Sequence, residues 1–150
     1  MQAPYPKQQN KRFLMNKSGS KKPTPTATPH GDELPLRLVL HIQNPTGGAP
    51  KILATRMRDK LIVGRTSVDT PVPVDIDLAL FDAVNTGVSR QHAAFYFADG
   101  TLEVEDLQST NGTRINGFPV QSGRRYRLRN GDELEFGRLQ MVIKIIRAAG

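Results

Sequence analysis

The sequence predicts an all-β protein: an antiparallel β-sandwich of about 11 strands that follows a disordered N-terminal segment. Three observations support this prediction. Apolar and polar residues alternate with a period of two, tight-turn pairs separate the alternating runs at short intervals, and no helical periodicity of useful length is present. Many short strands over about 110 residues are typical of a sandwich.

The clearest strand comes first. Residues 36–42 read LRLVLHI, with Leu or Ile at every second position, which indicates a strand with one buried face. The apolar stretches LIV at 61–63 and AFYF at 94–97 predict two further strands. Shorter alternating runs predict strands around Leu102–Glu105, Thr113–Ile115, Arg125–Arg129 and Glu133–Phe136, and a last one that ends at about Ile146.

Four turn pairs lie between these runs. Such pairs favour hairpin turns, because both central positions need positive φ. Two of them fall within the stretch DLQSTNGTRING, residues 106–117. We expect this stretch to form a rigid loop that presents its hydroxyls and its first Asn outward. The four pairs are Asp99-Gly100, Asn111-Gly112, Asn116-Gly117 and Asn130-Gly131.

Composition divides the chain into three parts. Residues 1–34 form a basic segment rich in Pro and Thr with little to bury, which we predict to be disordered. Residues 35–147 form the predicted domain, and 148–150 its C-terminal end. Residues 1–31 hold six Lys/Arg and no acid, which leaves 15 Lys/Arg against 14 Asp/Glu in residues 32–150. The near-neutral domain therefore argues against nucleic acid as its ligand.

Composition also indicates in which cellular compartment the protein acts. Cysteine is absent, which excludes disulfides, thiolate metal ligands and a Cys nucleophile. No apolar run approaches the roughly 18 residues that a membrane helix needs. The longest N-terminal apolar patch, Phe13–Met15, is shorter than the about 7–15 residues of a signal-peptide core. We expect a cytoplasmic protein that does not act at a membrane.

Three stretches carry side chains suited to an anion. LIVGR ends a predicted strand with Arg65, VSRQHA precedes the next predicted strand, and residues 106–117 contain two adjacent hydroxyls. Loops at one end of a sandwich can bring such residues together. Their donors include no acid, so they suit a phosphate dianion. The donors are Arg65, Ser89, Arg90, Ser109, Thr110 and Asn111.

The order of these motifs resembles the forkhead-associated (FHA) domain, a phosphothreonine-binding β-sandwich. The resemblance covers roughly residues 36–147, and its motifs are specific together rather than singly. It implies an FHA/SMAD-like fold. The motifs are Gly64-Arg65, then Ser89-Arg90-Gln91-His92, then Ser109-Thr110-Asn111-Gly112-Thr113 with Asn116-Gly117, and finally Asn130-Gly131-Asp132 and Phe136-Gly137.

The resemblance also implies roles for single residues. Arg65 would clamp the phosphate, Ser89 would donate its hydroxyl to it, and Arg90 would add a backbone or side-chain contact. Thr110 would contact the phosphate or the threonine from the other side, and Asn111 would hold the peptide backbone.

Other residues would shape the pocket. His92 would brace the loops through hydrogen bonds without touching the ligand, and Asn116 would either steady its loop or touch the peptide. Gly64, Ser109 and Gly112 would be structural. Ordinary interpretations remain open, since Arg65 could form a surface ion pair and Ser89 and Thr110 could simply cap turns.

Residues 66–88 form a longer connection than the family usually has. This insertion beside the pocket would be either a passive surface loop or an element that shapes specificity. The loop Asn85–Val88 before the Ser-Arg motif carries no charge. It therefore favours an apolar or weak preference, rather than an acidic one, at the third residue after the phosphothreonine.

The predicted function is a phosphothreonine-peptide binding module, a non-catalytic signalling adaptor downstream of a Ser/Thr kinase. The expected partners are a Thr-phosphorylated protein or peptide and that kinase. An enzyme is not expected, because the sequence offers no nucleophile–base–acid trio, no His pair at metal-ligand spacing and no phosphate-binding loop with Lys. Neither a cofactor nor a metal is expected.

Two hypotheses concern the N-terminal segment. Thr24, Thr26 and Thr28 are possible phosphoacceptors, and a phosphorylated Thr could enter the chain's own pocket or a neighbour's. Alternatively, the chain could be an FHA-fold scaffold whose basic segment binds nucleic acid or another acidic partner, and such binding would be salt-sensitive.

Overall fold

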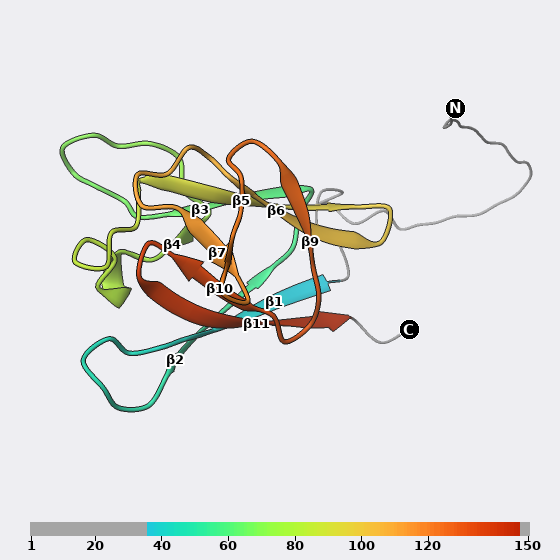
Figure 1. Cartoon of the computed structure of the whole chain (residues 1–150), viewed down its shortest axis with the longest axis horizontal. Helices are drawn as coiled ribbons and strands as arrows, with labels where there is room; N and C mark the ends of the chain where they lie inside the picture. The colour runs from blue at the N-terminus through green and yellow to red at the C-terminus, as the bar shows by residue number, and fades with distance from the viewer. Residues whose placement is uncertain (1–35, 148–150) are drawn as a thin grey trace, which may run out of the picture. The chain divides into compact units, whose positions relative to one another are not determined.

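Two packed β-sheets make up the part of the chain that the computed structural model describes, residues 36–147 (Figure 1). The predicted segment 1–34 and residues 148–150 lie outside this part. The elements are β1 (Leu36–Ile42), β2 (Lys51–Arg56), β3 (Lys60–Gly64), β4 (Ile76–Asp77), the 3-10 helix η1 (Ala79–Phe81), β5 (Gln91–Ala98), β6 (Thr101–Asp106), β7 (Thr113–Ile115), β8 (Phe118–Pro119), β9 (Arg125–Leu128), β10 (Glu133–Phe136) and β11 (Leu139–Arg147).

The strands divide into a six-stranded sheet, in the order β2-β1-β11-β10-β7-β8, and a five-stranded sheet, in the order β4-β3-β5-β6-β9. The described pairs are antiparallel except β3 with β4, which is parallel. The predicted β-sandwich of about 11 strands is therefore confirmed, with one parallel pair in addition. Within residues 36–147 no helix has the length and apolar character to cross a membrane.

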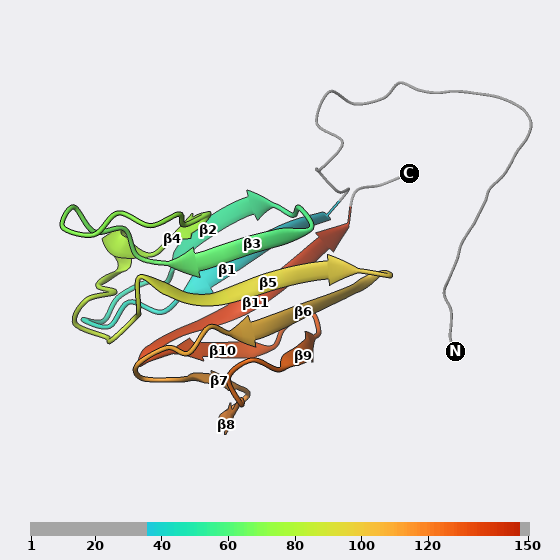
Figure 2. The same cartoon turned by 90° about the horizontal axis from the view of Figure 1, so that it is seen from above.

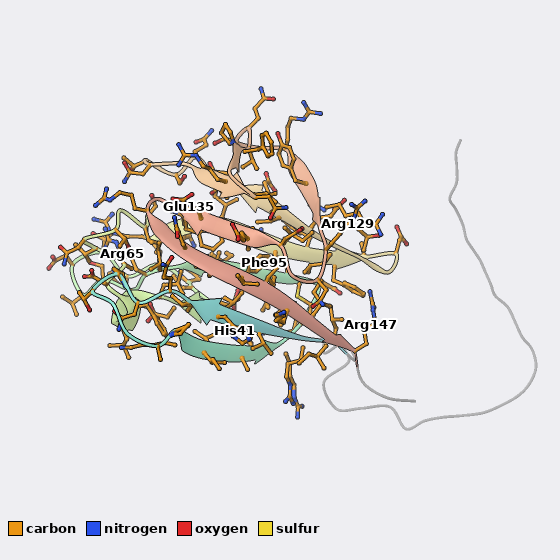
Figure 3. All side chains as sticks on the ribbon, turned by 60° about the horizontal axis from the view of Figure 1, so that its bottom comes forward. His41, Arg65, Phe95, Arg129, Glu135 and Arg147 are labelled. Atoms are coloured by element: carbon orange, nitrogen blue, oxygen red, sulfur yellow. The ribbon has the colours of Figure 1, made fainter. Side chains whose placement is uncertain are left out.

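The core lies between the sheets and follows the predicted alternation. In β1, every second side chain from Leu36 to Ile42 is buried, at 4% exposure or less. Phe95 from β5 lies in this core (Figure 3). Its ring meets that of Phe136 from β10 edge-on, with centroids 6.4 Å apart. Each fully buried large side chain of this kind contributes about 1.5–3 kcal/mol relative to exposure.

The four turn pairs fall into two groups. Asp99-Gly100 and Asn116-Gly117 close the hairpins β5–β6 and β7–β8, and both residues of each pair have positive φ as expected. The expectation was wrong for Asn111-Gly112 and Asn130-Gly131, where the glycine has positive φ and the Asn does not. These two pairs lie in connections that cross from the five-stranded to the six-stranded sheet, so they close no hairpin.

The long connection between β3 and β5 is fastened to the sandwich. Asp75 accepts the Ile62 backbone N–H at 2.7 Å, and Asp77 accepts the Thr66 hydroxyl at 2.7 Å. Burial by itself raises the pKa of Asp77, but its hydrogen bonds with Thr66 and Ala79 outweigh this and hold the pKa below the usual value. Four side chains of this β3–β5 connection are 2% exposed or less and belong to the core: Ile76, Leu78, Ala83 and Val88.

Gly64, at the end of β3, allows a close approach of two backbone segments. The register of β3 against β5 shifts between Val63 and Gly64, and a Cβ added at Gly64 would lie 1.9 Å from the Arg90 carbonyl oxygen. Any side chain here would therefore push the backbone of residues 89–90 away from β3.

Replacement of this glycine should destabilise the fold. Gly64→Ala is expected to lower the free energy of unfolding by about 3 kcal/mol, because backbone rather than a flexible side chain must move. Gly100→Ala is the control, since its Cβ would meet nothing within 4 Å, and it should cost only the about 1–2 kcal/mol of a left-handed residue. Urea unfolding measures both, and equal losses would contradict the steric argument.

Candidate functional site

Strand register brings three loops to one end of the sandwich. In the five-stranded sheet Gly64 pairs with Gln91 and Ala93 with Asp106, so the ends of β3 and β6 lie beside the start of β5 (Figure 2). In the six-stranded sheet Phe136 pairs with Thr113, which places the end of β10 beside the start of β7. The loops after β3, before β5 and between β6 and β7 therefore emerge together.

Arg65 is held in place by backbone carbonyls. Its N–H donates to Arg90 O at 3.1 Å and its side-chain Nε donates to Val88 O at 2.6 Å. Among residues 36–147, neither terminal guanidinium nitrogen has a hydrogen-bond or ion-pair partner. The surface ion pair that an ordinary Arg would form is thus not observed in this part of the chain, and the terminal nitrogens are available to an anion.

Ser89 and Thr110 connect two of the loops. The Thr110 backbone N–H donates to Ser89 Oγ at 3.1 Å, which leaves the Ser89 hydroxyl hydrogen without an acceptor among the described residues. Asn111 makes a second connection, because its Nδ2 donates to Gly87 O at 3.0 Å. The Asn111 Oδ1 atom remains unbonded within residues 36–147.

His92 is fully buried below these loops. Its Nδ1 accepts the Ser89 backbone N–H at 3.0 Å, so the ring proton lies on Nε2, which donates to Gly112 O at 2.9 Å. The ring packs against Phe136 with centroids 5.2 Å apart. Burial lowers the pKa of His92, although the Gly112 carbonyl and the Asp106 carboxylate oppose the shift. The imidazole is therefore neutral at physiological pH.

Asp106 organises the third loop, and the sequence interpretation did not single it out. Its carboxylate is 2% exposed and accepts the Ser109 hydroxyl and the Thr113 hydroxyl, both at 2.6 Å, and the Ser122 hydroxyl. Burial alone raises the pKa of Asp106, but these hydrogen bonds together hold it below the usual value. The spacing Asp106–Ser109 is typical of side-chain-to-backbone turns and could have indicated this role.

Ser109 and Gly112 complete the loop between β6 and β7, and Gly137 ties it to the β10–β11 turn. Ser109 Oγ accepts the Gly112 backbone N–H at 2.9 Å, and Gly112 has φ of +86°. Gly112 O also accepts the Gly137 N–H at 2.9 Å, which ties the β10–β11 turn to the site. Gly137 itself allows close approach, since a Cβ there would lie 2.5 Å from Thr86 O.

Two predicted contact residues stand apart from this arrangement. Arg90 uses its carbonyl to hold Arg65, while its exposed guanidinium has no partner within residues 36–147. Asn116 lies at the other end of β7 from Thr113. Its Nδ2 donates to Asp132 at 3.1 Å and its Oδ1 accepts the Glu133 N–H at 2.9 Å. Both polar atoms of the Asn116 side chain therefore hold the start of β10.

A sequence profile of the FHA domain matches residues 61–137, which span all of these loops. This chain belongs to the FHA domain family. The resemblance drawn from the motifs is thereby confirmed. The matched residues run from Leu61, within β3, to Gly137.

Curated relatives share this FHA domain. FraH of Nostoc is 37% identical over 78 residues, which cover 52% of this chain and 27% of FraH. The glycogen accumulation regulator GarA of Mycolicibacterium smegmatis is 41% identical over 68 residues, which cover 45% of this chain and 39% of GarA. The chain thus matches well under half the length of these relatives.

Solved FHA domains share the architecture. The FhaA FHA domain, in complex with the intracellular domain of another protein, superposes with a TM-score of 0.51 at 26% identity and covers 71% of this chain and 99% of that one. A domain from an analysis of phosphothreonine-dependent FHA interactions has a TM-score of 0.52 at 26% identity and covers 72% and 95%. Yeast Pml1p, at 22% identity, has a TM-score of 0.60 over 81% of this chain and 100% of that one and shows the fold alone.

The buried His92 should make this FHA domain less stable in mild acid. Because its folded-state pKa lies below the ordinary value of about 6.5, the unfolded chain is protonated first as the pH falls. The stabilisation is therefore complete above about pH 6.5 and is lost as the pH falls towards the folded pKa, by up to about 1.4 kcal/mol per pH unit. Urea unfolding between pH 7.5 and 5.5 measures this slope.

The matched variant is His92→Gln, which removes the titrating ring. It should be less stable at pH 7.5 and should lack most of the slope below pH 6.5. If the wild type and the variant show the same slope, other groups carry the pH dependence and the neutral imidazole is not its cause.

Proposed function

We propose that this FHA domain binds peptides that carry a phosphothreonine and serves as a non-catalytic signalling adaptor downstream of a Ser/Thr kinase. The observation that carries the proposal is the arrangement of Arg65, Ser89 and Thr110. The terminal nitrogens of Arg65 and the hydroxyls of Ser89 and Thr110 lie at one end of the sandwich on loops joined by hydrogen bonds, and no acceptor within residues 36–147 competes for these donors. The related domain studied for phosphothreonine-dependent interactions supports the proposal.

The chemistry of the ligand fits these donors. A phosphate carries about −1.5 to −2 charges at pH 7 and three strong acceptor oxygens. The two terminal nitrogens of Arg65 can take two of them, and the Ser89 and Thr110 hydroxyls can donate to the third or to the same oxygens. Each charge-assisted hydrogen bond contributes about 1.5–3 kcal/mol. Less the costs of association, this is enough for reversible binding.

Asn111 and Asn116 have different proposed roles. Asn111 has its Nδ2 committed to Gly87 O, so its free Oδ1 can accept a backbone N–H of the bound peptide. We assign Asn116 to steadying its loop rather than touching the peptide, because Asp132 and Glu133 occupy both of its polar atoms. Thr24, Thr26 and Thr28 lie outside the described residues and stay possible phosphoacceptors.

Loss of the central cation should abolish most of the affinity. Arg65→Ala removes two charge-assisted bonds and is expected to weaken phosphothreonine-peptide binding by about 3 kcal/mol or more, roughly a hundredfold. Isothermal titration of the full chain against a degenerate phosphothreonine pool, with phosphoserine and unphosphorylated pools beside it, measures the effect. Ser89→Ala is expected to cost about tenfold, since it removes one bond.

The control is Arg124→Ala, which also removes one positive charge; Arg124 is exposed whereas Arg65 is half-buried, and its guanidinium bonds only to the Gln121 side chain among the described residues. It should bind as the wild type does. Equal weakening in both Arg variants would show a general charge effect. Absence of any phosphate-dependent binding would favour the alternative, a scaffold whose basic segment binds nucleic acid or another acidic partner, and a steep loss of that binding with salt would identify it.

The segment before Ser89 suggests what flanks the phosphothreonine. Val84 is 67% exposed, and its carbonyl accepts the Gly87 N–H, so it lies beside the loop that Asn111 contacts. An exposed apolar surface next to a binding site favours an apolar ligand side chain. Arg138 also reaches this loop, because its guanidinium donates to Asn85 O.

A peptide array can decide whether Val84 or Arg138 sets the preference at the third residue after the phosphothreonine. With the third residue after phosphothreonine varied, apolar residues should bind several-fold better than Asp, and Val84→Asp should reduce that preference. A preference for Asp that disappears in Arg138→Gln would instead assign the position to Arg138 and contradict the apolar reading.

A further inference from the structure

A second group of guanidiniums lies at the end of the sandwich away from Arg65. Figure 3 shows Arg129 and Arg147 at that end and Arg65 at the other. Arg127, Arg129 and Arg147 line one open pocket of about 480 Å³, whose rim also includes Gly100, Thr101 and Asn130 and whose lining contains no acidic residue. None of these residues belongs to the phosphothreonine site.

Both sheets build this pocket. Leu102 pairs with Leu128, so the turn before β6 and the turn after β9 lie side by side in the five-stranded sheet. Arg147 ends β11 in the six-stranded sheet, and its Nη2 donates to Gly100 O at 3.4 Å. Asn130 Oδ1 accepts the Ile145 N–H at 2.7 Å. These bonds fix the rim across the two layers.

The three guanidiniums lack the carboxylate partners that neighbouring arginines have, and Arg147 lies 5.9 Å from the centroid of the Phe97 ring. No carboxylate of residues 36–147 lies within 4.0 Å of any of them. By contrast, Arg125 stacks on the Tyr96 ring at 3.6 Å and lies 3.9 Å from Glu105, while Arg114 lies 4.0 Å from Glu135. Convergent like charges without a counterion repel one another, so an anion in the pocket would relieve the repulsion.

The acids nearest in the fold form no ion pair with these guanidiniums among residues 36–147. Asp99 adjoins Gly100 in the β5–β6 turn, and Glu103 pairs in register with Arg127, yet neither forms an ion pair among the described residues. Asp132 is already occupied by the Asn116 side chain and by the Arg129 backbone N–H.

We propose that this pocket is a second anion site, which binds a phosphate-class oxyanion. The guanidiniums supply forked donors that match such an anion. Asn130 adds its Nδ2, because its Oδ1 is used by Ile145, and the Thr101 hydroxyl has no other partner within residues 36–147. The two sites lie about one strand apart, and a six-residue strand such as β6 spans roughly 20 Å. A partner with one phosphate can therefore occupy one site at a time.

The test is an NMR titration of the full chain with inorganic pyrophosphate at constant ionic strength. It follows the backbone amides of Gly100, Thr101 and Asn130 and the side-chain Nε–H signals of arginine. We expect saturable shifts at these positions. In the double variant Arg129→Gln/Arg147→Gln the apparent Kd should rise by about tenfold or more. Both side chains are exposed, so unchanged amide positions elsewhere verify the fold.

Two controls separate this site from the first. Arg124→Gln should leave the far-end shifts unchanged, and Arg65→Ala should abolish shifts near Ser89 while keeping those at Gly100. The source of the phosphate is then tested on the Arg65→Ala protein. If a singly phosphorylated peptide shifts the Gly100, Thr101 and Asn130 signals, the ligand is a phosphoryl group carried by a peptide. If only pyrophosphate shifts these signals, the ligand is a free oxyanion. Shifts that never saturate, or that Arg124→Gln reduces as much as the double variant, would overturn the proposal.

Discussion

The binding end depends on one buried, neutral imidazole. His92 accepts a hydrogen bond from the Ser89 backbone N–H before β5 and donates one to the Gly112 carbonyl after β6, so a single side chain sets the position of both loops. Both of its nitrogens are satisfied without charge. A partner removed from either side would leave a buried polar group unpaired, at a cost of about 1–3 kcal/mol. Ser89 and Gly112 can therefore hardly move independently.

Asp106 has the complementary role for the loop that carries Thr110 and Asn111. Its buried carboxylate is ionised because hydroxyls from Ser109, Thr113 and Ser122 surround it. The ionised acid thus faces inward, while the donors of the loop face solvent. The loop is ordered before any ligand arrives, which lowers the entropy that binding must overcome.

Local patterns predicted the fold and most of its strands, because alternation and turn pairs act over a few residues. They did not predict β2 or the two-residue strands β4 and β8. Arg65, Ser89 and Thr110 could be named from their motifs, and the family match over residues 61–137 confirms the resemblance to FHA domains. The spacing Asp106–Ser109 could indicate a local turn, but it could not show that the same carboxylate also accepts the hydroxyl of Ser122, which is distant in sequence. The role of Asn116 was left open for the same reason: its partners Asp132 and Glu133 follow from the pairing of β7 with β10. Turn pairs likewise do not reveal whether the next strand lies in the same sheet.

The pairing of β1 with β11 has a consequence for architecture. Leu36 and Arg147, the first and last described residues, are direct partners across these antiparallel strands, and the register runs from there towards Met141 near the binding loops. Chain enters and leaves the sandwich at one point, on the side away from Arg65. A domain whose two ends are adjacent can be inserted into a longer polypeptide without disturbing its sheets. The loops around Arg65 would then lie at the end opposite the points of attachment.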